Sequence, residues 1–343
     1  MIPTRTLLTA LVFTCSIFSA PLVIATNAPV KVSFTAKQSQ LTKEIMHLLE
    51  QQHYQPRIND DGLANDIFTN YLTLLDPLKS YLSQMDLAPY QYLKHELDDL
   101  LPQGDLRPMA DMYNVLQQRR LEFIDFNLAW LSQPSSMFNF ELNEHIAMAP
   151  QDAARQPDHQ AIKNLWRKQL KNEFINGQIS NETQTQIKNR LEKRYLNMRK
   201  RVLQVELRDA YQALSNSITT ATDPHTTYLS PRNVEDFNID MSLSLEGIGA
   251  VLQRDNDYTK VVRLVAGGPA DKAGDLQASD YIVGVGQEGE AIQEILGWRL
   301  DDVVDQIRGP KGSLVKLHII PGGDLQQAKK TIQIRRNKVN LDD

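Results

Sequence analysis

Residues 245–249, with the sequence Leu-Glu-Gly-Ile-Gly, form the pattern that most clearly predicts a binding site in this chain. Consecutive backbone N–H groups on a glycine-rich turn can point into one concavity, which suits a carboxylate. An apolar strand follows directly, and an open strand edge can pair with the backbone of an extended peptide. We therefore predict a site that holds the C-terminus of another protein. The residues assigned to its loop and strand are Leu245, Glu246, Gly247, Ile248, Gly249, Ala250, Val251 and Leu252.

A predicted helix at 300–308 supplies the other wall of this site. Leu300, Val304 and Ile307 recur with the spacing i, i+4, i+7, which places them on one helical face. We expect them to receive the last apolar side chain of a bound peptide. The alternative is that the glycine turn only begins a strand and the apolar stripe only fills a core. Either motif taken alone favours that alternative.

Short β-rich runs surround these motifs from about residue 238 onward. Turn signals at 309–312 and 321–323 separate some of them, and a second short helical piece is predicted at 270–273. The pattern predicts an α+β domain, a small partly open β-barrel with two helices. The predicted strands lie within residues 242–252, 259–265, 281–285, 314–320 and 331–334.

The preceding part of the chain, residues 31–237, is predicted to be all-α. Apolar residues recur at helical spacing in 35–54, 105–131 and 181–215, and Asn181 with Gln184 is the predicted N-terminal capping pair of the last of these helices. Residues 133–160 contain three prolines among polar residues and are predicted to form a loop. The chain is thus expected to be multidomain.

From about residue 35 to its end, the chain resembles the C-terminal processing peptidase family, and within it the bacterial periplasmic tail-specific branch. The stretch 246–250 is similar to the carboxylate-binding loop of the family's PDZ domain. The segment 223–231, Asp-Pro-His-Thr-Thr-Tyr-Leu-Ser-Pro, is similar to the one that precedes this PDZ domain, and 297–304 and 308–313 match further motifs. The likeness is strongest between Asp223 and Ser313, although Ser279 stands where the family usually has glycine.

This resemblance implies an N-terminal helical domain at 31–237, a PDZ domain at 238–337 and the start of a linker at 338–343. It implies partners as well: apolar, unstructured C-terminal tails of protein substrates, an adaptor protein, and the periplasmic face of the membrane as a peripheral contact. Tail binding would rotate the PDZ domain about segments near Leu245 and Val339.

The family cleaves proteins with a serine activated by a lysine, in a domain that follows the PDZ domain. We find no glycine-rich serine segment opening a helix between Met1 and Asp343, so we assign no catalytic residue and expect this stretch alone to be inactive. The first interpretation is therefore the substrate-recruiting part of a serine endopeptidase. The alternative is a non-catalytic periplasmic adaptor that binds peptides.

Composition argues against several other classes. The net charge is −5, and the basic residues at 188–201, with Glu182, Glu192 and Glu206 nearby, are typical of a solvated helix face, so we expect no nucleic-acid partner. The histidines have no metal-ligand spacing and no phosphate-binding loop is present, so we expect no metal and no cofactor. Asp223 and His225 are close in sequence, but the proline between them favours a structural turn over a catalytic pair.

The N-terminus has the pattern of a secretory signal. Arg5 precedes an apolar run at 7–17, and we expect cleavage after Ala25, which makes 1–25 a signal peptide and the protein periplasmic. An uncleaved membrane anchor is the alternative. Cys15 is the only cysteine, so the mature chain would have no thiol chemistry.

Overall fold

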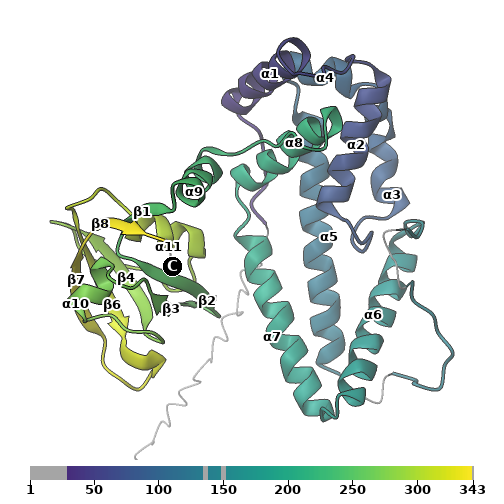
Figure 1. Cartoon of the computed structure of the whole chain (residues 1–343). Helices are drawn as coiled ribbons and strands as arrows, with labels where there is room; N and C mark the ends of the chain where they lie inside the picture. The colour runs from purple at the N-terminus through teal and green to yellow at the C-terminus, as the bar shows by residue number, and fades with distance from the viewer. Residues whose placement is uncertain (1–28, 134–137, 148–151, 342–343) are drawn as a thin grey trace, which may run out of the picture.

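The computed structural model describes residues 29–133, 138–147 and 152–341 of the chain. The predicted signal peptide, 1–25, and its cleavage site lie outside the described residues. A helical part comes first and a part built from strands follows it, as predicted (Figure 1). The α-helices of the first part are α1 (Ala36–Gln51), α2 (Asp61–Leu75), α3 (Gln84–Leu87), α4 (Leu97–Gln103), α5 (Arg107–Leu131), α6 (His159–Ile179), α7 (Gln184–Leu203), α8 (Leu207–Thr222) and α9 (Pro231–Ser242).

The long helix α5 (Figure 1) contributes residues to two apolar cores of the helical part. Met109 and Leu116, in its first half, are buried with residues of α1, α2, α4 and α8. Ile124 and Leu131, in its second half, are buried with residues of α6 and α7. Apolar residues therefore recur along the whole length of α5, as its sequence predicted.

The prediction of one helix over 181–215 is wrong, because the helix is interrupted: α7 ends at Leu203 and α8 begins at Leu207. The α8 helix begins with its own capping box, in which the Glu206 backbone N–H donates to the Asp209 carboxylate at 2.9 Å. The predicted cap at Asn181 is wrong as well, since Thr183 is the N-cap of α7 and Gln186 completes its capping box. Asn181 has a left-handed φ of 60° and ends the preceding turn.

The segment between α8 and α9 is a structural turn. The Asp223 carboxylate accepts a hydrogen bond from the His225 backbone N–H at 2.6 Å and another from the Tyr54 hydroxyl. Ser230 then caps α9, whose first residue is a proline. The helix continues to Ser242, beyond the predicted domain boundary at 237, and the change from helix to strand falls at Leu243.

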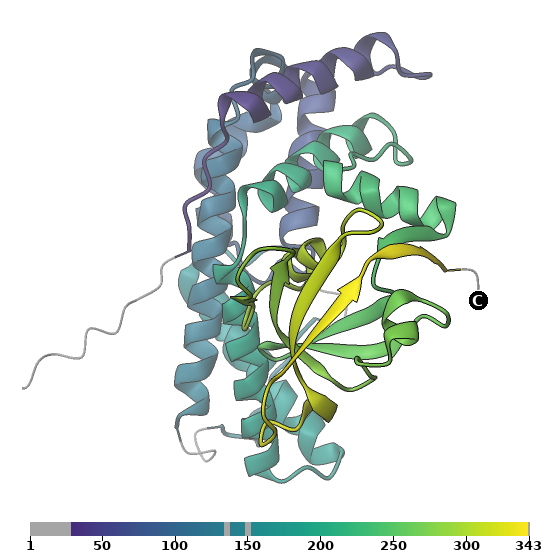
Figure 2. The ribbon, with the colours of Figure 1, turned by 90° about the vertical axis from the view of Figure 1, so that its left-hand side faces the viewer.

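The second part contains a sheet in the order β2-β3-β4-β6-β7, with β5 paired to β4, and a separate ribbon of β1 and β8. The sheet is not closed into a barrel, and two helices pack with it, which confirms the predicted α+β class (Figure 2). Strand β8 was missed by the sequence, which predicted a linker from 338 onward. The elements are β1 (Ser244–Gly247), β2 (Ala250–Asp255), β3 (Tyr258–Leu264), α10 (Pro269–Ala273), β4 (Tyr281–Gln287), β5 (Gln293–Glu294), α11 (Leu300–Ile307), β6 (Leu314–Ile320), β7 (Lys330–Arg335) and β8 (Asn337–Asn340).

Polar contacts join the two parts. The predicted basic face of α7 is involved, because Lys200 pairs with Asp257 in the β2–β3 turn at 2.6 Å. The guanidinium of Arg208, on α8, pairs with Asp302 of α11 at the same distance. Other cations of α7 pair with acids of neighbouring helices, as Arg194 does with Glu173 at 2.9 Å.

Candidate peptide-binding groove

The carbonyl groups of the loop between β1 and β2 are hydrogen-bonded to neighbouring backbone N–H groups. The Ile248 carbonyl accepts from the Ala270 N–H, and the Gly249 carbonyl accepts from the Val265 N–H, each at 2.8 Å. Gly249 has a φ of +74°, a conformation that glycine adopts without strain. Within the described part of the chain, no acceptor is recorded for the N–H of Ile248 or of Gly249. Two backbone donors at the end of β1 are therefore available to an anion.

The strand that follows this loop has one open edge, because β2 pairs only with β3 in the described sheet. Ala250 and Leu252 pack toward the apolar core of this part, whereas Val251 lies on the opposite face and is exposed. A groove of about 580 Å³ runs along β2 beside α11. Its lining residues are Ile239, Asp240, Leu245, Gly247, Ile248, Gly249, Ala250, Val251, Leu252, Arg263, Leu264, Val265, Ala266, Val304, Ile307, Arg308 and Leu341.

The structure brings most of the predicted site residues together in this groove. Val304 and Ile307 line it, but Leu300 does not, because it lies in the first turn of α11 and the groove follows the last. Glu246 is directed elsewhere, and its carboxylate accepts a hydrogen bond from the Lys311 backbone N–H at 2.8 Å.

The last turn of α11 is held by a buried arginine. The Arg336 side chain donates to the carbonyls of Ile307, at 2.8 Å, and Gln306, at 2.9 Å, and to the side-chain oxygen of Gln287 at 2.7 Å. Carbonyls at a helix C-terminus have no intrahelical donor and carry partial negative charge, so a cation there is favourable. Burial lowers the pKa of the Arg336 guanidinium, which nevertheless stays charged. This contact positions one wall of the groove.

Sequence reasoning missed the residues that other elements bring to the groove. Ile239 and Asp240 come from the end of α9, Arg263 comes from β3, and Leu341 follows β8. Arg308 lies at the end of α11, where its guanidinium pairs with Asp236 of α9 at 2.7 Å. The only signal in the sequence was the helical pattern of α9. The predicted domain boundary at 237 excluded Ile239 and Asp240 from that helix.

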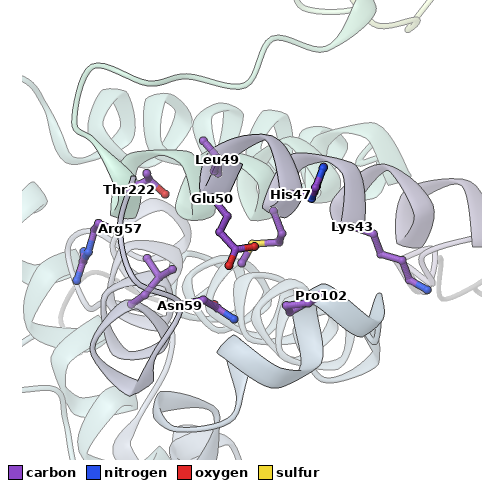
Figure 3. A pocket seen from close by; sticks show the side chains of 10 residues that line it. Lys43, His47, Leu49, Glu50, Arg57, Asn59, Pro102 and Thr222 are labelled. Carbon is purple, nitrogen blue, oxygen red and sulfur yellow. The ribbon is translucent and has the colours of Figure 1, made fainter. Parts of the chain in front are cut away.

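A smaller pocket of about 240 Å³ lies in the helical part between α1, α2 and α4 (Figure 3). Glu50 reaches toward its middle, with Lys43 and His47 on the same helix (Figure 3). Arg57 also lines it, but its guanidinium is engaged by Asp66 at 2.7 Å and by the Ala221 carbonyl at 2.6 Å. The pocket mixes opposite charges around a small volume, so it is a weaker candidate than the groove.

The described residues contain no group of three or more histidine, cysteine, aspartate or glutamate side chains placed to hold a metal ion. None of their helices is long and apolar enough to cross a membrane.

A helical domain followed by an α+β domain with a groove between an edge strand and a helix defines a multidomain protein of the PDZ class. Comparison with protein families agrees: residues 45–232 match the tail specific protease N-terminal domain, and residues 236–320 match the PDZ domain. The first match covers more than half of the chain, and the chain belongs to the tail-specific protease family.

Individual relatives are consistent with this family. A tail-specific protease of Haemophilus influenzae is 35% identical over 321 residues, which are 92% of this chain and 45% of that protein. A probable CtpA-like serine protease of Staphylococcus aureus is 30% identical over 172 residues, 49% of this chain and 33% of that protein. The chain thus spans less than half the length of either relative.

Among solved structures, the PDZ domain of a carboxy-terminal protease from Vibrio cholerae, in complex with a peptide, is 55% identical. It matches over 29% of this chain and 100% of that domain, with a TM-score of 0.28.

Proposed function

We propose that this chain is the substrate-recruiting part of a serine-type tail-specific protease, and that its groove binds the apolar C-terminal tails of protein substrates. The observation that carries the proposal is the pair of N–H groups on Ile248 and Gly249, which end an apolar groove beside an open strand edge. Membership of the tail-specific protease family and the match to the PDZ domain support it.

In this binding mode the tail adds a strand to β2, and its terminal carboxylate accepts hydrogen bonds from the two free N–H groups. The last side chain enters the groove between Ile248, Val304 and Ile307, all of which line it. Residues upstream of the C-terminus extend along β2 away from the loop.

We further propose export to the bacterial periplasm by a signal peptide at 1–25, followed by the helical domain at 31–237 and the PDZ domain at 238–337. The linker predicted from 338 is not proposed again, because residues 337–340 form β8, which pairs with β1. The apolar run near Arg5 supports export. An adaptor protein, a peripheral contact with the membrane, and rotation of the PDZ domain near Leu245 and Val339 are proposed from the family resemblance alone.

Peptide binding tests the proposal directly. Fluorescence anisotropy would compare a labelled ten-residue apolar tail carrying a free C-terminal carboxylate with the same tail carrying a C-terminal amide. We expect the amide to bind at least about tenfold more weakly, because charge-assisted hydrogen bonds are lost. Val304→Ala should weaken binding of the free tail, and Leu300→Ala tests the predicted wall residue that the groove does not include. Equal affinity for the acid and the amide would overturn the proposal.

The second candidate is a non-catalytic adaptor. The sequence of the coding DNA beyond codon 343 would distinguish it from the protease. A reading frame that continues into a domain with a glycine-rich serine segment would support the protease. A stop codon at that point would favour the adaptor, since the peptide-binding groove would then be the part that acts.

A further inference from the structure

We propose that Arg263 makes the groove selective for tails that carry an acidic side chain one or three residues before the C-terminus, positions −1 and −3. This inference rests on the proposed tail binding. Arg263 lies on β3 directly opposite Val251 of β2, and both residues line the groove. Its side chain is exposed, and across the described ranges no acid or other acceptor is recorded for its guanidinium.

The alternation of side chains along a strand determines which positions of the tail lie on the same face as Arg263. Residues that lie opposite one another on adjacent strands point to the same face of a sheet. The terminal side chain of the tail, position 0, points into the groove with Ala250 and Leu252, so position −2 does as well. Positions −1 and −3 then share the opposite face with Val251 and Arg263.

The distances suit an ion pair. Neighbouring strands lie about 4.8 Å apart, so a tail paired with β2 lies about 10 Å from β3. A long arginine side chain and a glutamate side chain, each leaning over Val251, together cover that separation.

An irregularity in β3 supports the same assignment. The pairing of β2 with β3 shifts between Val251 and Leu252, whose partners are Arg263 and Val261, so Val262 is left without a partner. Such a bulge bends the strand and redirects the side chains beside it. Val262 and Arg263 are consecutive and both exposed, which a regular strand packed on one face does not show. The bulge thus presents Arg263 at the rim of the groove.

The other charged residues of the groove do not take this role. The guanidinium of Arg308 is already paired with Asp236 at 2.7 Å. Asp240 belongs to α9, which packs against β1, and a carboxylate there would repel an acidic side chain. Arg263 is therefore the cation of the groove that an acidic side chain of the tail can reach.

The test uses labelled ten-residue tails that end in alanine and differ only by glutamate or glutamine at position −1, −2 or −3. Anisotropy would give the dissociation constants for this chain in 50 mM and in 500 mM NaCl. We expect glutamate at −1 or −3 to bind about two- to fivefold more tightly than glutamine at low salt. Screening should reduce this ratio toward one at high salt. At −2 glutamate should bind more weakly than glutamine, because its charge would enter the apolar groove.

Three variants complete the design. Arg263→Gln should remove the preference for glutamate at −1 and −3, and Arg263→Glu should reverse it, so that glutamine binds more tightly than glutamate at these positions. Arg335→Gln is the matched control, because it removes a cation from β7, at the opposite edge of the sheet, and should keep the preference.

The outcomes separate this inference from the proposal on which it rests. Glutamate and glutamine tails that bind equally to the unchanged chain, or a preference that survives in Arg263→Gln, would overturn the role of Arg263 alone. Failure of every tail to bind, including the uncharged ones, would overturn the proposed tail binding and this role with it.

Discussion

Arg299 and Asp209 join the PDZ domain to the helical domain by two parallel contacts. The guanidinium Nη1 lies 2.6 Å from Oδ2 of the carboxylate, and Nη2 lies 3.1 Å from Oδ1. Both side chains are partly buried, at 21% and 32% exposure. Arg299 is the residue before α11, so this ion pair connects the start of the groove helix with the start of α8.

Removing this ion pair should loosen the contact between the two domains. Partial burial acts to raise the pKa of the Asp209 carboxyl, but hydrogen bonds from Arg299 and from the Glu206 backbone outweigh it, and the pKa lies below its usual range. A lowered folded-state pKa means that the pair stabilises the docked state fully above about pH 4, and that this stabilisation is lost as the pH falls through the folded value. Arg299→Met should abolish that pH-dependent part and raise the undocked fraction severalfold, for a pair worth about 1 kcal/mol.

Energy transfer between fluorophores would measure docking. Cys15 is the only native cysteine, so once it is removed, cysteines introduced at Thr185 and Glu288 carry the labels. Lys330→Gln serves as the control, because Lys330 pairs with Asp275 inside the PDZ domain at 2.8 Å. If Arg299→Met and Lys330→Gln changed the transfer efficiency alike between pH 7 and pH 3, the Arg299–Asp209 pair would not be what holds the domains together.

Gly249→Ala should reduce the affinity for a free-carboxylate tail by about tenfold or more. A Cβ there would lie 3.3 Å from the Cα of Gly268, and the φ of +74° is unfavourable for alanine, so the loop would move and its two donors with it. Gly267→Ala is the matched control: its φ is +70°, but its Cβ would meet nothing within 4 Å. Both variants should lose about 1 kcal/mol of stability.

Peptide anisotropy and thermal unfolding of both variants would check this expectation. Equal losses of affinity in Gly249→Ala and Gly267→Ala would show that backbone strain alone, and not the position of the loop donors, governs binding.

Ser279→Gly should stabilise the PDZ domain. Ser279 has a φ of +75°, which costs an L-residue roughly 1–2 kcal/mol, and its N–H bond to the Val261 carbonyl at 2.8 Å does not need the side chain. The greater freedom of glycine in the unfolded chain offsets part of this, which leaves a gain of about 0.5–1 kcal/mol. Calorimetry of the chain would measure it, and Ser279→Ala, which keeps the Cβ, should give no gain.

Local patterns predicted the parts of the groove and of the sheet that depend on local sequence. The glycines at 247 and 249 mark the turn, and the apolar run at Leu314–Ile320 coincides with β6, because turn chemistry and alternation act over a few residues. Ser279 could be identified as a position that favours glycine, although its φ could not.

The residues that tertiary contacts bring to the groove could not be predicted in the same way. Strand β8 buries only Val339 and is otherwise polar, so its pairing with β1 leaves no apolar pattern in the sequence. The period i, i+4, i+7 places Leu300 on the same face as Ile307, but it contains no information about where along α11 the groove ends. The break after Leu203 was detectable in principle from Glu206 and Asp209, a capping pair without the usual serine or threonine.

Replacing Arg336 should both destabilise the PDZ domain and weaken tail binding. Arg336 is 3% exposed, and over the described ranges no carboxylate pairs with it. Arg336→Met would leave the Ile307 carbonyl without a donor, whereas the Gln306 carbonyl would keep its bond from Gln287 Nε2 at 3.0 Å. Leaving one buried carbonyl unpaired costs about 1–3 kcal/mol. The last turn of α11 carries Ile307, so a loosened turn also disturbs the groove. The stability of Arg336→Lys should lie between that of the unchanged chain and that of Arg336→Met, because a single ammonium cannot reach the same set of acceptors.

The neighbouring arginine provides the control for this prediction. Arg335 is exposed and donates to the Gly312 carbonyl at 2.7 Å, so Arg335→Met should change the free energy of unfolding by less than about 0.5 kcal/mol and leave the affinity for an apolar tail unchanged. Thermal unfolding and anisotropy on both variants would separate the two positions. A tail affinity that stayed unchanged in a folded Arg336→Met variant would mean that the groove does not depend on the position of the last turn of α11.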